Sequence, residues 1–483
     1  MRAVFTAQQI RDAERVLIDR LPAGTLMRRA AFGLAVHLAR ILGERAGGVA
    51  GSRVVLLVGA GDNGGDALWA GAELRRRGAS VTAVLLAPDR AHPAGLAALR
   101  SAGGRAIPAA RGADAVARSD LVVDGIVGIS GRGALRDPAP ALADAAAEAG
   151  VPVVAVDLPS GVDTDTGVVA GSAVTATETV TFGALKPVHV LAAARCGPVH
   201  LVDIGLGPLL PEPHATVLDD ADVAAGWPLP GPTDDKYTQG VTGVAAGSAT
   251  YPGAAVLATG AAVLATSGMV RFAGTAADGV RAAWPEVVAT DDVADAGQVQ
   301  AWVVGPGLGT DADGHRVVEF VAGRGVPLCV DADAITLLAQ HRDLRDAVRG
   351  RPVVITPHDR EFARVAGEVG HDRIDAARRA AADLGVTVLL KGNATVVADP
   401  GGRVLVHPSA GSWAATAGSG DVLSGILGAL LAAGREPAWA AAAATHVHGR
   451  AAGLAAAGAP APASAIQAHI PAAIRAVLAA RPA

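Results

Sequence analysis

Short apolar runs alternate with amphipathic segments along almost the whole chain of 483 residues. The first run, Val54–Val58, is followed by a glycine-rich turn and a helix-like segment that ends near Arg77. Five consecutive apolar residues without polar alternation are typical of a strand covered on both faces, which occurs in parallel sheets flanked by helices. The sequence therefore predicts an α/β fold with parallel sheets.

The same pattern locates further elements in both halves of the chain. Strands are expected at 81–86, 121–123, 153–156, 178–182, 199–202, 241–246, 299–304, 327–331, 353–356 and 386–390. A hairpin is expected to turn at the Asp-Pro-Gly-Gly segment 399–402. Helices are expected at 7–20 and 25–42, and two alanine-rich helices close the chain.

Residues 207–235 are crowded with proline and glycine and have little periodicity, which indicates a domain junction. A chain of 483 residues also exceeds the size of one ordinary domain. We therefore expect two different α/β domains in tandem, at residues 1–215 and 236–483, joined by a linker at 216–235.

Composition narrows the class of protein. Hydrophobic residues make up 51% and charged residues 18%, so stable cores are expected rather than disorder. The net charge of -5 gives no overall attraction to nucleic acid. The two cysteines lie far apart in different predicted domains, which favours a reducing cytoplasm over a disulfide framework. The N-terminus has no apolar core of signal-peptide length.

The segment 237–270 contains no charged residue, which raises the question of a membrane span. A spanning helix takes about 20 mainly apolar residues. This segment is rich in glycine, alanine, threonine and serine and is interrupted by Pro252. We therefore expect a strand, a glycine-rich loop and a buried helix, and no association with a membrane.

A glycine-rich loop follows the first strand. Residues 59–64 match the GxGxxG pattern of dinucleotide-binding turns, but the next strand lacks the acidic residue that such folds place on the ribose. The whole loop, Asp62-Asn63-Gly64-Gly65-Asp66, offers backbone N–H groups to an anion and the Asn63 carbonyl oxygen to a hard cation. The alternative is that Asn63 and Asp66 cap a helix.

Two more strand ends carry matching groups. Asp124 ends one strand and precedes the glycine-rich loop 128–133, and Asp157 and Ser160 end the next. Carboxyl ends of parallel strands meet at one edge of a sheet, where ligands bind. The three loops together predict a ligand site, although Asp157 by itself could fix a turn.

The most informative turn lies at 418–421, Gly-Ser-Gly-Asp, at an expected helix start. Small residues and helix N–H groups favour phosphate binding. Asp421 would repel a phosphate, so its position favours a base that deprotonates a hydroxyl attacking a phosphoryl group. A first-turn acidic residue after a glycine-rich cap is the alternative.

Other strand ends point to the same region. A glycine-rich loop at 305–309 follows one strand, His358 another, and Lys391-Gly392 with Thr395 a third. His446 and His448 are two residues apart, so on a helix they point in different directions, and we do not expect a metal site there.

Residues 5–210 resemble the epimerase domain, and residues 236–480 the ribokinase-like dehydratase domain, of bifunctional NAD(P)H-hydrate repair enzymes. The first resemblance rests on the NGGD loop, the Asp124 strand and DLPSG, and the second on GPGLG, TPH, KG and GSGD. It implies a Rossmann-like three-layer α/β/α domain followed by a ribokinase-like α/β domain. It also implies that the first interconverts R and S hydrates of NADH or NADPH, and that the second dehydrates the S form with ADP.

The resemblance implies a role for particular residues. Asp421 and Asp157 are the expected catalytic residues. The expected potassium ligands are Asn63, Asp124 and Ser160. The hydrate in the epimerase domain is expected to meet Asp62, Asn63, Gly64, Gly65, Asp66, Gly128, Ile129, Ser130, Gly131, Arg132, Gly133, Ala134 and Asp157. In the dehydratase domain it is expected to meet Ala254, Gly307, His358 and Asp421, and ADP to meet Lys391, Gly392, Asn393, Ala394, Thr395, Gly418, Ser419 and Gly420.

Potassium and magnesium are the implied ions, ADP is the co-substrate, and a homo-oligomer is expected. The chain departs from the family pattern at Ala67, where glycine is usual, and at Asp235, Thr336 and 359–360. ADP versus ATP stays open from the sequence alone. So do two other functions: a ribokinase-type small-molecule kinase, and an N-terminal module that binds nucleotide without turnover.

Overall fold

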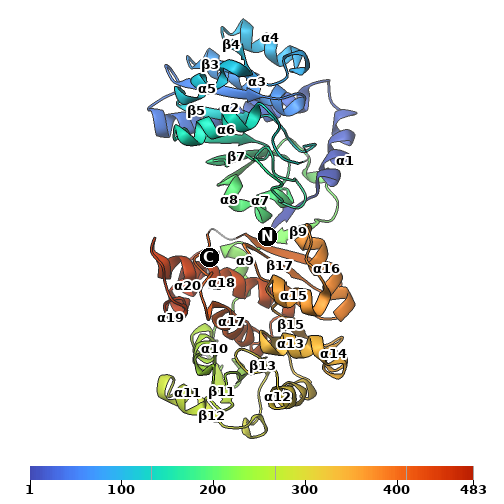
Figure 1. Cartoon of the computed structure of the whole chain (residues 1–483), viewed down its shortest axis with the longest axis vertical. Coiled ribbons are helices and arrows are strands. Elements are labelled where there is room, and N and C mark those ends of the chain that lie inside the picture. The colour runs from blue at the N-terminus through green and yellow to red at the C-terminus, as the bar shows by residue number, and fades with distance from the viewer. Residues whose placement is uncertain (132, 267, 409–410, 482–483) are drawn as a thin grey trace. The chain divides into compact units, whose positions relative to one another are not determined.

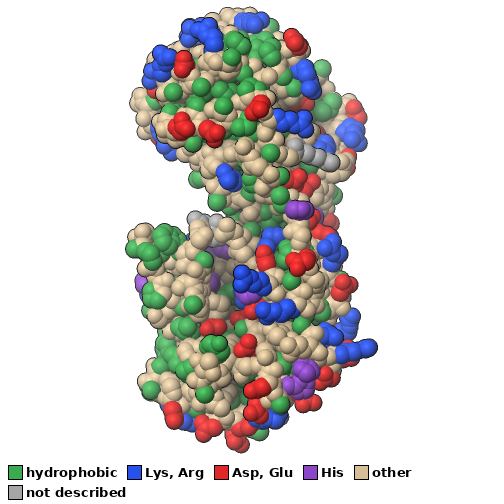
Figure 2. Space-filling model, in the orientation of Figure 1, with side chains coloured by type: hydrophobic (Ala, Val, Ile, Leu, Met, Phe, Trp, Pro, Cys, Tyr) green, Lys and Arg blue, Asp and Glu red, His purple; other side chains and the backbone are tan. Residues whose placement is uncertain are grey.

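The computed structural model describes residues 1–131, 133–266, 268–408 and 411–481. The chain forms two compact units, one comprising Ala3–His214 and the other comprising Ala215–Ala483 with Met1–Arg2 (Figure 1). Each unit is built on one large, mainly parallel sheet, which confirms the predicted α/β class. On the face drawn in Figure 2, acidic and basic side chains are interspersed on both units.

The N-terminal unit contains a seven-stranded sheet in which every neighbouring pair is parallel. In spatial order its strands are β4 (Arg105–Pro108), β3 (Ser80–Leu85), β2 (Arg53–Val58), β5 (Leu121–Gly125), β6 (Val153–Val156), β7 (Glu178–Phe182) and β8 (Val199–Val202). Six of them were predicted. The edge strand β4 was not, because four residues that begin with arginine and end with proline carry no apolar run.

Helices cover both faces of this sheet. Leu56 packs in a core formed with α2 and α3, and Leu57 packs in a core on the other face with α6, as expected from the period of two along a strand. The unit therefore has the three layers that the sequence predicted. Its helices are α1 (Ala7–Ile18), α2 (Thr25–Ala46), α3 (Asp62–Arg76), α4 (Pro93–Ser101), α5 (Gly112–Ala117), α6 (Ala139–Glu148), α7 (Pro187–Leu191) and α8 (Ala193–Cys196).

The C-terminal unit has the larger sheet, in which β16, β17 and β18 form the expected antiparallel hairpin region beside a parallel set. In spatial order the strands are β1 (Arg2–Val4), β9 (Ala215–Val217), β18 (Val404–Pro408), β17 (Ala394–Ala398), β16 (Thr387–Leu390), β15 (Val353–Ile355), β14 (Leu328–Val330), β13 (Ala301–Val304), β10 (Val241–Ala245), β11 (Met269–Ala273) and β12 (Val288–Thr290). The short strands β1, β9, β11 and β12 were not predicted.

One face of this sheet is covered by a core of small side chains. Val303 of β13 lies in that core, while Trp302, the preceding residue, points the opposite way. The helices in the core are α9 (Asp220–Gly226), α10 (Pro252–Ala265), α11 (Ala277–Ala283), α17 (Ser419–Ala432), α18 (Pro437–Ala456), α19 (Ala463–Ala468) and α20 (Ile470–Leu478). The remaining helices are α12 (Ala312–Gly323), α13 (Asp333–Gln340), α14 (Arg342–Val348), α15 (Asp359–Ala366) and α16 (Arg373–Leu384).

The predicted linker at 216–235 contains two regular elements in its first part. Residues 215–226 form β9 and α9, and β9 pairs with β18 of the C-terminal sheet. Trp227 is buried in the core of the same unit. Proline and glycine in the surrounding sequence masked a three-residue strand and a short helix capped by Asp219, whose side chain accepts a hydrogen bond from the Asp222 N–H.

The uncharged segment 237–270 forms β10, a loop and the buried helix α10, as predicted. In the part of the chain that the structure describes, no helix is both long enough and apolar enough to span a bilayer. Four helices, α17 to α20, close the chain rather than the two that the sequence indicated, because α19 and α20 are short.

Candidate active sites

The first candidate site lies where β2, β5 and β6 end. Asp124, the fourth residue of β5, is fully buried. Its carboxylate accepts hydrogen bonds from the Ser160 N–H at 2.8 Å, from the Ser160 hydroxyl at 2.7 Å and from the Ile126 N–H at 3.2 Å. All three of these donors are neutral, and burial raises the pKa of Asp124 to about 6.

Asn63 and Gly128 lie against each other, and a Cβ on Gly125, the residue after Asp124, would stand 3.2 Å from the Asn63 backbone carbonyl oxygen. A Cβ on Gly128 would stand only 3.0 Å from the Asn63 Oδ1, so only glycine leaves room for the amide. The buried Nδ2 of Asn63 has no hydrogen-bond partner. A buried carboxylate without a cationic partner, next to amide and hydroxyl oxygens, is a donor set that suits a hard cation.

Asp157 follows β6 and has the left-handed backbone conformation, with φ of 69°. For a residue with a side chain this conformation adds roughly 1–3 kcal/mol of strain, and such strain clusters at functional sites. The Asp157 carboxylate accepts hydrogen bonds from the Lys186 Nζ at 2.7 Å and from the Thr181 hydroxyl at 3.0 Å. Burial alone would raise the pKa of Asp157, but the Lys186 ammonium holds it below its usual range.

His189 completes this network with a fixed tautomer. Its Nδ1 accepts the Lys186 N–H at 3.0 Å, so its Nε2 donates to the Asp157 carbonyl at 2.9 Å. Burial lowers the pKa of His189 to about 4, so the ring is neutral at pH 7. The site therefore holds one ionised carboxylate on a strained backbone, with its Oδ1 bonded to an ammonium group and a hydroxyl.

A second carboxylate in the same region behaves in the opposite way. Asp66 is buried, and its Oδ1 has no hydrogen-bond partner. Burial first, and then the charge of Asp157, raises its pKa well above the usual range. Asp66 lines a cavity of about 320 Å³ together with Asp62 and Glu14, whose pKa is also raised by burial.

The predicted glycine loop lines a different cavity, of about 430 Å³. Asp62 and Asp66 thus face one cavity and most of the 128–134 loop faces another, with Asn63 against Gly128. Gly64 and Gly65 lie in the first turn of α3, and Ile129 packs at the edge of the adjacent core. The predicted loop residues on the second cavity are Ser130, Gly131, Gly133 and Ala134; Arg132 lies outside the described residues.

The second candidate site lies at the start of α17. Gly418 is the N-cap with φ of 83°, Ser419 begins the helix, and Asp421 lies in its first turn. Burial first, and then the negative charge of Asp331, raises the pKa of Asp421 to about 7. A carboxylate with this pKa at neutral pH can accept a proton and release it again.

Lys391 lies next to this turn. Its Nζ donates to the Asp331 Oδ1 at 2.8 Å and lies 3.7 Å from the Glu361 Oε2. A Cβ on Gly420 would stand 3.5 Å from the Lys391 Nζ and 3.8 Å from the Asp331 Oδ2. The helix start, the ammonium group and a buried carboxylate therefore converge, as the sequence predicted for Lys391 and 418–421.

Asp331 is held from several sides. Besides Lys391, it accepts a hydrogen bond from the Ser424 hydroxyl at 2.7 Å and from the Ala332 N–H at 2.9 Å. Burial alone would raise the pKa of Asp331, but Lys391 lowers it. Ala332 has a φ of 50°, so this site also contains a strained residue that is not glycine.

Two predicted pocket residues come together at the 305–309 loop. A Cβ on Gly307 would stand 3.0 Å from the Cβ of Ala254 and 2.8 Å from that of Tyr251. His358 has a structural task in addition, because its Nδ1 accepts the Arg360 and Glu361 N–H groups and caps α15. Its side chain is about half exposed, at 51%.

A cavity of about 420 Å³ adjoins the predicted nucleotide-binding residues. Gly392 and Thr395 line it together with Trp413 and His448. Asn393 lies in the exposed turn before β17, and Ala394 is buried at its start. His448 forms a 2.9 Å hydrogen bond with the Ser419 hydroxyl, which ties the cavity wall to α17.

His446 and His448 do not share a partner, as expected from their spacing. The Nε2 of His446 contacts the Asp220 Oδ1 at 2.6 Å, whereas His448 contacts Ser419.

Two family models match the chain. One described as NAD(P)H-hydrate dehydratase matches residues 242–471, and one described as YjeF-related protein N-terminus matches residues 23–188. A bifunctional NAD(P)H-hydrate repair enzyme Nnr of Mycobacterium leprae is 58% identical over 457 residues and 94% of each chain. A protein of the same name from Mycobacterium tuberculosis is 58% identical over 92% of each chain.

The chain belongs to the bifunctional NAD(P)H-hydrate repair enzyme family. Among solved structures, a ribokinase-like superfamily protein from Enterococcus faecalis V583 aligns with a TM-score of 0.50 and 23% identity, covering 55% of this chain and 96% of that chain. This likeness shows a ribokinase-like fold for the C-terminal unit of this family member.

The departures from the family pattern have structural explanations. Ala67, in place of the usual glycine, lies within the helix α3 and is fully buried, so no left-handed backbone is involved. The Thr336 hydroxyl accepts a hydrogen bond from Arg364 at 2.9 Å, and Asp359 pairs with Arg373 at 2.8 Å. The exposed Asp235 accepts the N–H groups of residues 237 and 238.

Sequence reasoning missed Lys186, which is the partner of Asp157. One signal could have found it: the chain has only three lysines among its 41 basic residues, at positions 186, 236 and 391. A chain that uses arginine almost everywhere keeps lysine where a compact point charge is required. Two of the three lysines bind the buried carboxylates of the two sites.

Proposed function

We propose that this chain repairs hydrated NADH and NADPH, interconverting the R and S hydrates in its N-terminal unit and dehydrating the S hydrate in its C-terminal unit with ADP. Family membership supports both activities. The dehydratase proposal rests on the position of Asp421, which lies in the first turn of α17 beside Lys391 and has a pKa of about 7.

Dehydration requires a better leaving group than the ring hydroxyl. Asp421 removes the hydroxyl proton, and the ring oxygen attacks the terminal phosphorus of ADP, which releases AMP. The carbon–oxygen bond of the phosphate ester then breaks, pushed by the electron pair of the ring nitrogen, and phosphate leaves. Loss of a proton from the neighbouring ring carbon restores the double bond, so the products are reduced cofactor, AMP and phosphate.

The neighbouring groups have complementary roles in this proposal. The N–H groups at the start of α17 and the Lys391 ammonium bind the negative charge of the phosphates. Magnesium would arrive with ADP, because this ion is usually bound by substrate phosphates more than by protein cages. Within the described residues, neither cluster of three histidine, cysteine or acidic ligands lies at this turn.

Epimerisation requires that the hydroxyl leaves the ring and that water returns on the other face. A neutral acid can give the hydroxyl its proton, so that water departs while the ring nitrogen forms a double bond to the carbon. Asp66, with its raised pKa, suits this donor, and the ionised Asp157 suits stabilisation of the positively charged ring. The returning water gives its proton back, and the enzyme is unchanged.

Potassium in this proposal is bound by Asn63, Asp124 and Ser160. Its charge would compensate the buried Asp124 carboxylate, which accepts hydrogen bonds from three neutral donors. The ion would thereby hold the 128–134 loop against α3, since Gly128 contacts Asn63. Asp124 and Ser160 then position the loop rather than exchange protons with the substrate.

The deciding experiment compares the full-length protein with the variant Asp421→Asn on purified S and R hydrates, with ADP and ATP in parallel. The variant is expected to lose about 10²–10⁴-fold in dehydration, the contribution typical of a general base, while epimerisation is retained. Recovery of the reduced-ring absorbance measures dehydration, and chromatography of the hydrates measures epimerisation. Normal dehydration by the variant would contradict the assignment of the base.

The same assay separates the alternatives. A stable phosphorylated small molecule would point to a ribokinase-type kinase, and an R hydrate that never yields S would point to an N-terminal binding module. A cytoplasmic location and a homo-oligomeric state are part of the proposal as predictions from the sequence.

A further inference from the structure

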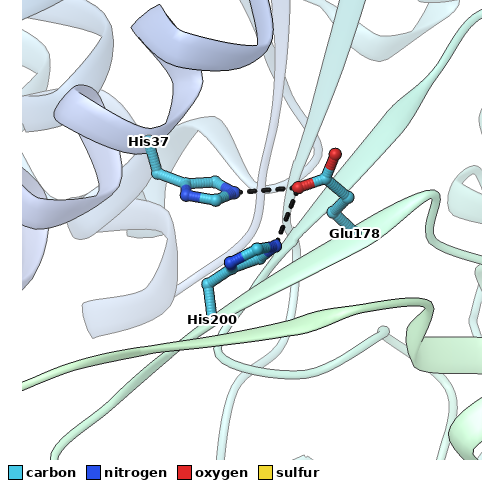
Figure 3. Close-up of side chains that lie close together, drawn as sticks. All are labelled: His37, Glu178 and His200. Atoms are coloured by element: carbon cyan, nitrogen blue, oxygen red, sulfur yellow. Dashed lines mark hydrogen bonds and ion pairs between the residues drawn. The ribbon is translucent and has the colours of Figure 1, made fainter. Parts of the chain in front are cut away.

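A cluster of two histidines and one glutamate lies in the N-terminal unit (Figure 3). The Nε2 of His37 lies 3.0 Å from the Glu178 Oε2, and the Nε2 of His200 lies 2.9 Å from the same oxygen. All three ligand atoms are within 4.8 Å of one another. Ligand atoms around a tetrahedral zinc ion are separated by roughly 3.4 Å, from bonds of about 2.1 Å.

The fold brings these side chains together from three elements. In the parallel pair β7–β8, His200 lies opposite Val180, so Glu178, two residues earlier, points to the same face. The helix α2 covers that face and approaches β8 closely, since a Cβ on Gly33 would stand 2.4 Å from the Val202 side chain. His37 lies one turn after Gly33 and therefore reaches the same place.

Hydrogen bonds alone do not satisfy this cluster. The Nη2 of Arg40 lies 3.1 Å from the His37 Nε2 and 2.8 Å from the Glu178 Oε2. Arginine only donates and a carboxylate only accepts. A proton on the His37 Nε2 would meet the Arg40 Nη2, which is also a donor. A lone pair on that atom would meet the Glu178 carboxylate, which is also an acceptor.

His200 is also incompletely paired. Its Nε2 is buried and has no hydrogen-bond partner, although the Glu178 oxygen is within ion-pair distance. The ligand atoms of two imidazoles and one carboxylate thus lie close together, where one cation can bind all three. Arg40 supplies positive charge there, but its side chain is 43% exposed and also binds Glu44, so it can move away.

We propose that His37, Glu178 and His200 bind one divalent transition-metal ion, of which zinc is the representative. Two imidazoles with one carboxylate suit zinc, nickel or cobalt, whereas magnesium and calcium prefer oxygen ligands alone. The His200 side chain is 38% exposed, which gives the ion a route from solvent, while His37 and Glu178 are exposed by only 12% and 13%.

The proposed ion joins α2 to the last two strands of the sheet. Glu178 begins β7, whereas Thr181, which contacts Asp157, lies three residues further along it. The ion is therefore a structural link, separate from the potassium ligands in its residues and in its chemistry. It should raise the stability of the N-terminal unit and take no part in the hydrate reactions.

The test uses the full chain, freed of metal by a chelator and kept in potassium without ADP. Equilibrium dialysis against zinc measures stoichiometry and affinity for the wild type, His200→Ala, Glu178→Gln and Arg40→Met. His341→Ala is the matched control, because the described residues contain a second three-ligand cluster, His315, His341 and Asp343, in the other unit. Circular dichroism verifies the fold of each variant.

The wild type and the control are expected to bind the same tight equivalent of zinc. His200→Ala and Glu178→Gln should bind it at least about 10-fold more weakly, a loss that even changes in groups hydrogen-bonded to metal ligands can cause. Arg40→Met should bind it more tightly, because a competing cation is gone. Equal affinity in the wild type, His200→Ala and Glu178→Gln, or weaker binding in Arg40→Met, overturns the proposal.

Two measurements on the wild type alone keep the proposal testable if a ligand variant fails to fold. Zinc should raise the thermal unfolding temperature of the N-terminal unit, and a chelator should reverse the shift. Cobalt should give the visible absorption of an ion with nitrogen ligands, which zinc then displaces. Absence of either effect overturns the proposal.

Discussion

The two candidate sites share a buried carboxylate–lysine pair, yet the lysines are placed differently. Lys186 is almost wholly buried, with 1% of its side chain exposed, and donates to Asp157, Thr181 and a backbone carbonyl. Lys391 keeps 21% exposure and lies between Asp331 and Glu361 at the start of α17. The first lysine has its donors occupied by the protein, whereas the second can still meet a phosphate.

The second acid of each site sharpens the contrast. Asp66 and Asp421 both have raised pKa values. Asp66 lies near Asp157, which is paired with the buried Lys186, whereas Asp421 lies next to Lys391, which is partly exposed. The same residue types therefore serve two purposes. In the N-terminal site the lysine keeps the Asp157 carboxylate ionised near the nicotinamide ring of the substrate. In the C-terminal site the lysine is available to bind the phosphates of ADP.

The largest expected effect comes from removing each lysine in turn. Lys186→Met leaves a buried, unpaired Asp157 and should lower the free energy of unfolding of the N-terminal unit by about 3–5 kcal/mol, with loss of epimerisation. Lys391→Met should abolish ADP-dependent dehydration with a smaller loss of stability, since Asp331 keeps Ser424 and the Ala332 N–H. Chemical denaturation and the two activity assays check both. Equal destabilisation by the two variants would remove the distinction.

Potassium should matter for the first site only. Replacing it with a large organic cation should destabilise the N-terminal unit by about 2.7 kcal/mol if the ion was present at about 100 times its Kd. Without the ion the pKa of Asp124 is raised to about 6, so its affinity for potassium should weaken as the pH falls below that value, because protons then compete with the ion for the carboxylate. Thermal unfolding across pH measures this, and Asp124→Asn should be insensitive to potassium.

The pH profiles of the two activities should run in opposite directions. Asp421 must be ionised to act as a base, so kcat/KM for dehydration should fall about tenfold per pH unit below its pKa of about 7. Asp66 must be protonated to act as an acid, so epimerisation should be lost as the pH rises through its raised pKa. Parallel profiles measured on the same protein would contradict the assignment of the two acids.

The smallest expected effect concerns the helix that begins at the first site. Ala67 is helical, and glycine in a helix interior is less stable than alanine by about 1 kcal/mol. Ala67→Gly should lower the stability of the N-terminal unit by that amount without changing KM for the hydrate. Increased stability would show that alanine strains the turn after all.

Much of the fold, and several residues of the two candidate sites, could be predicted because they follow from local sequence patterns. Apolar runs located the central strands, and polar residues immediately after them located Asp124, Ser160 and Lys391. The short strands β1, β9, β11 and β12 escaped because three to five residues with mixed side chains carry no period that distinguishes a strand from a loop.

Residues missed at the sites are those whose partners are distant in the chain. Lys186 is 29 residues from Asp157, and Ser424 is 93 residues from Asp331. No spacing rule connects such pairs; only the folded sheet brings the loops together. The divergent pKa values of Asp66 and Asp157 likewise depend on burial and on charges that neither local sequence contains.

The scarcity of lysine also makes the chain unusually selective toward amine-reactive chemistry. Lys186 is enclosed and Lys391 is held by Asp331, while Lys236 lies in an exposed segment. Besides the terminal amine, an acylating reagent or a fluorescent ester should therefore label position 236 first. ADP should further protect Lys391, so the labelling rate at that lysine reports occupancy of the phosphate site directly.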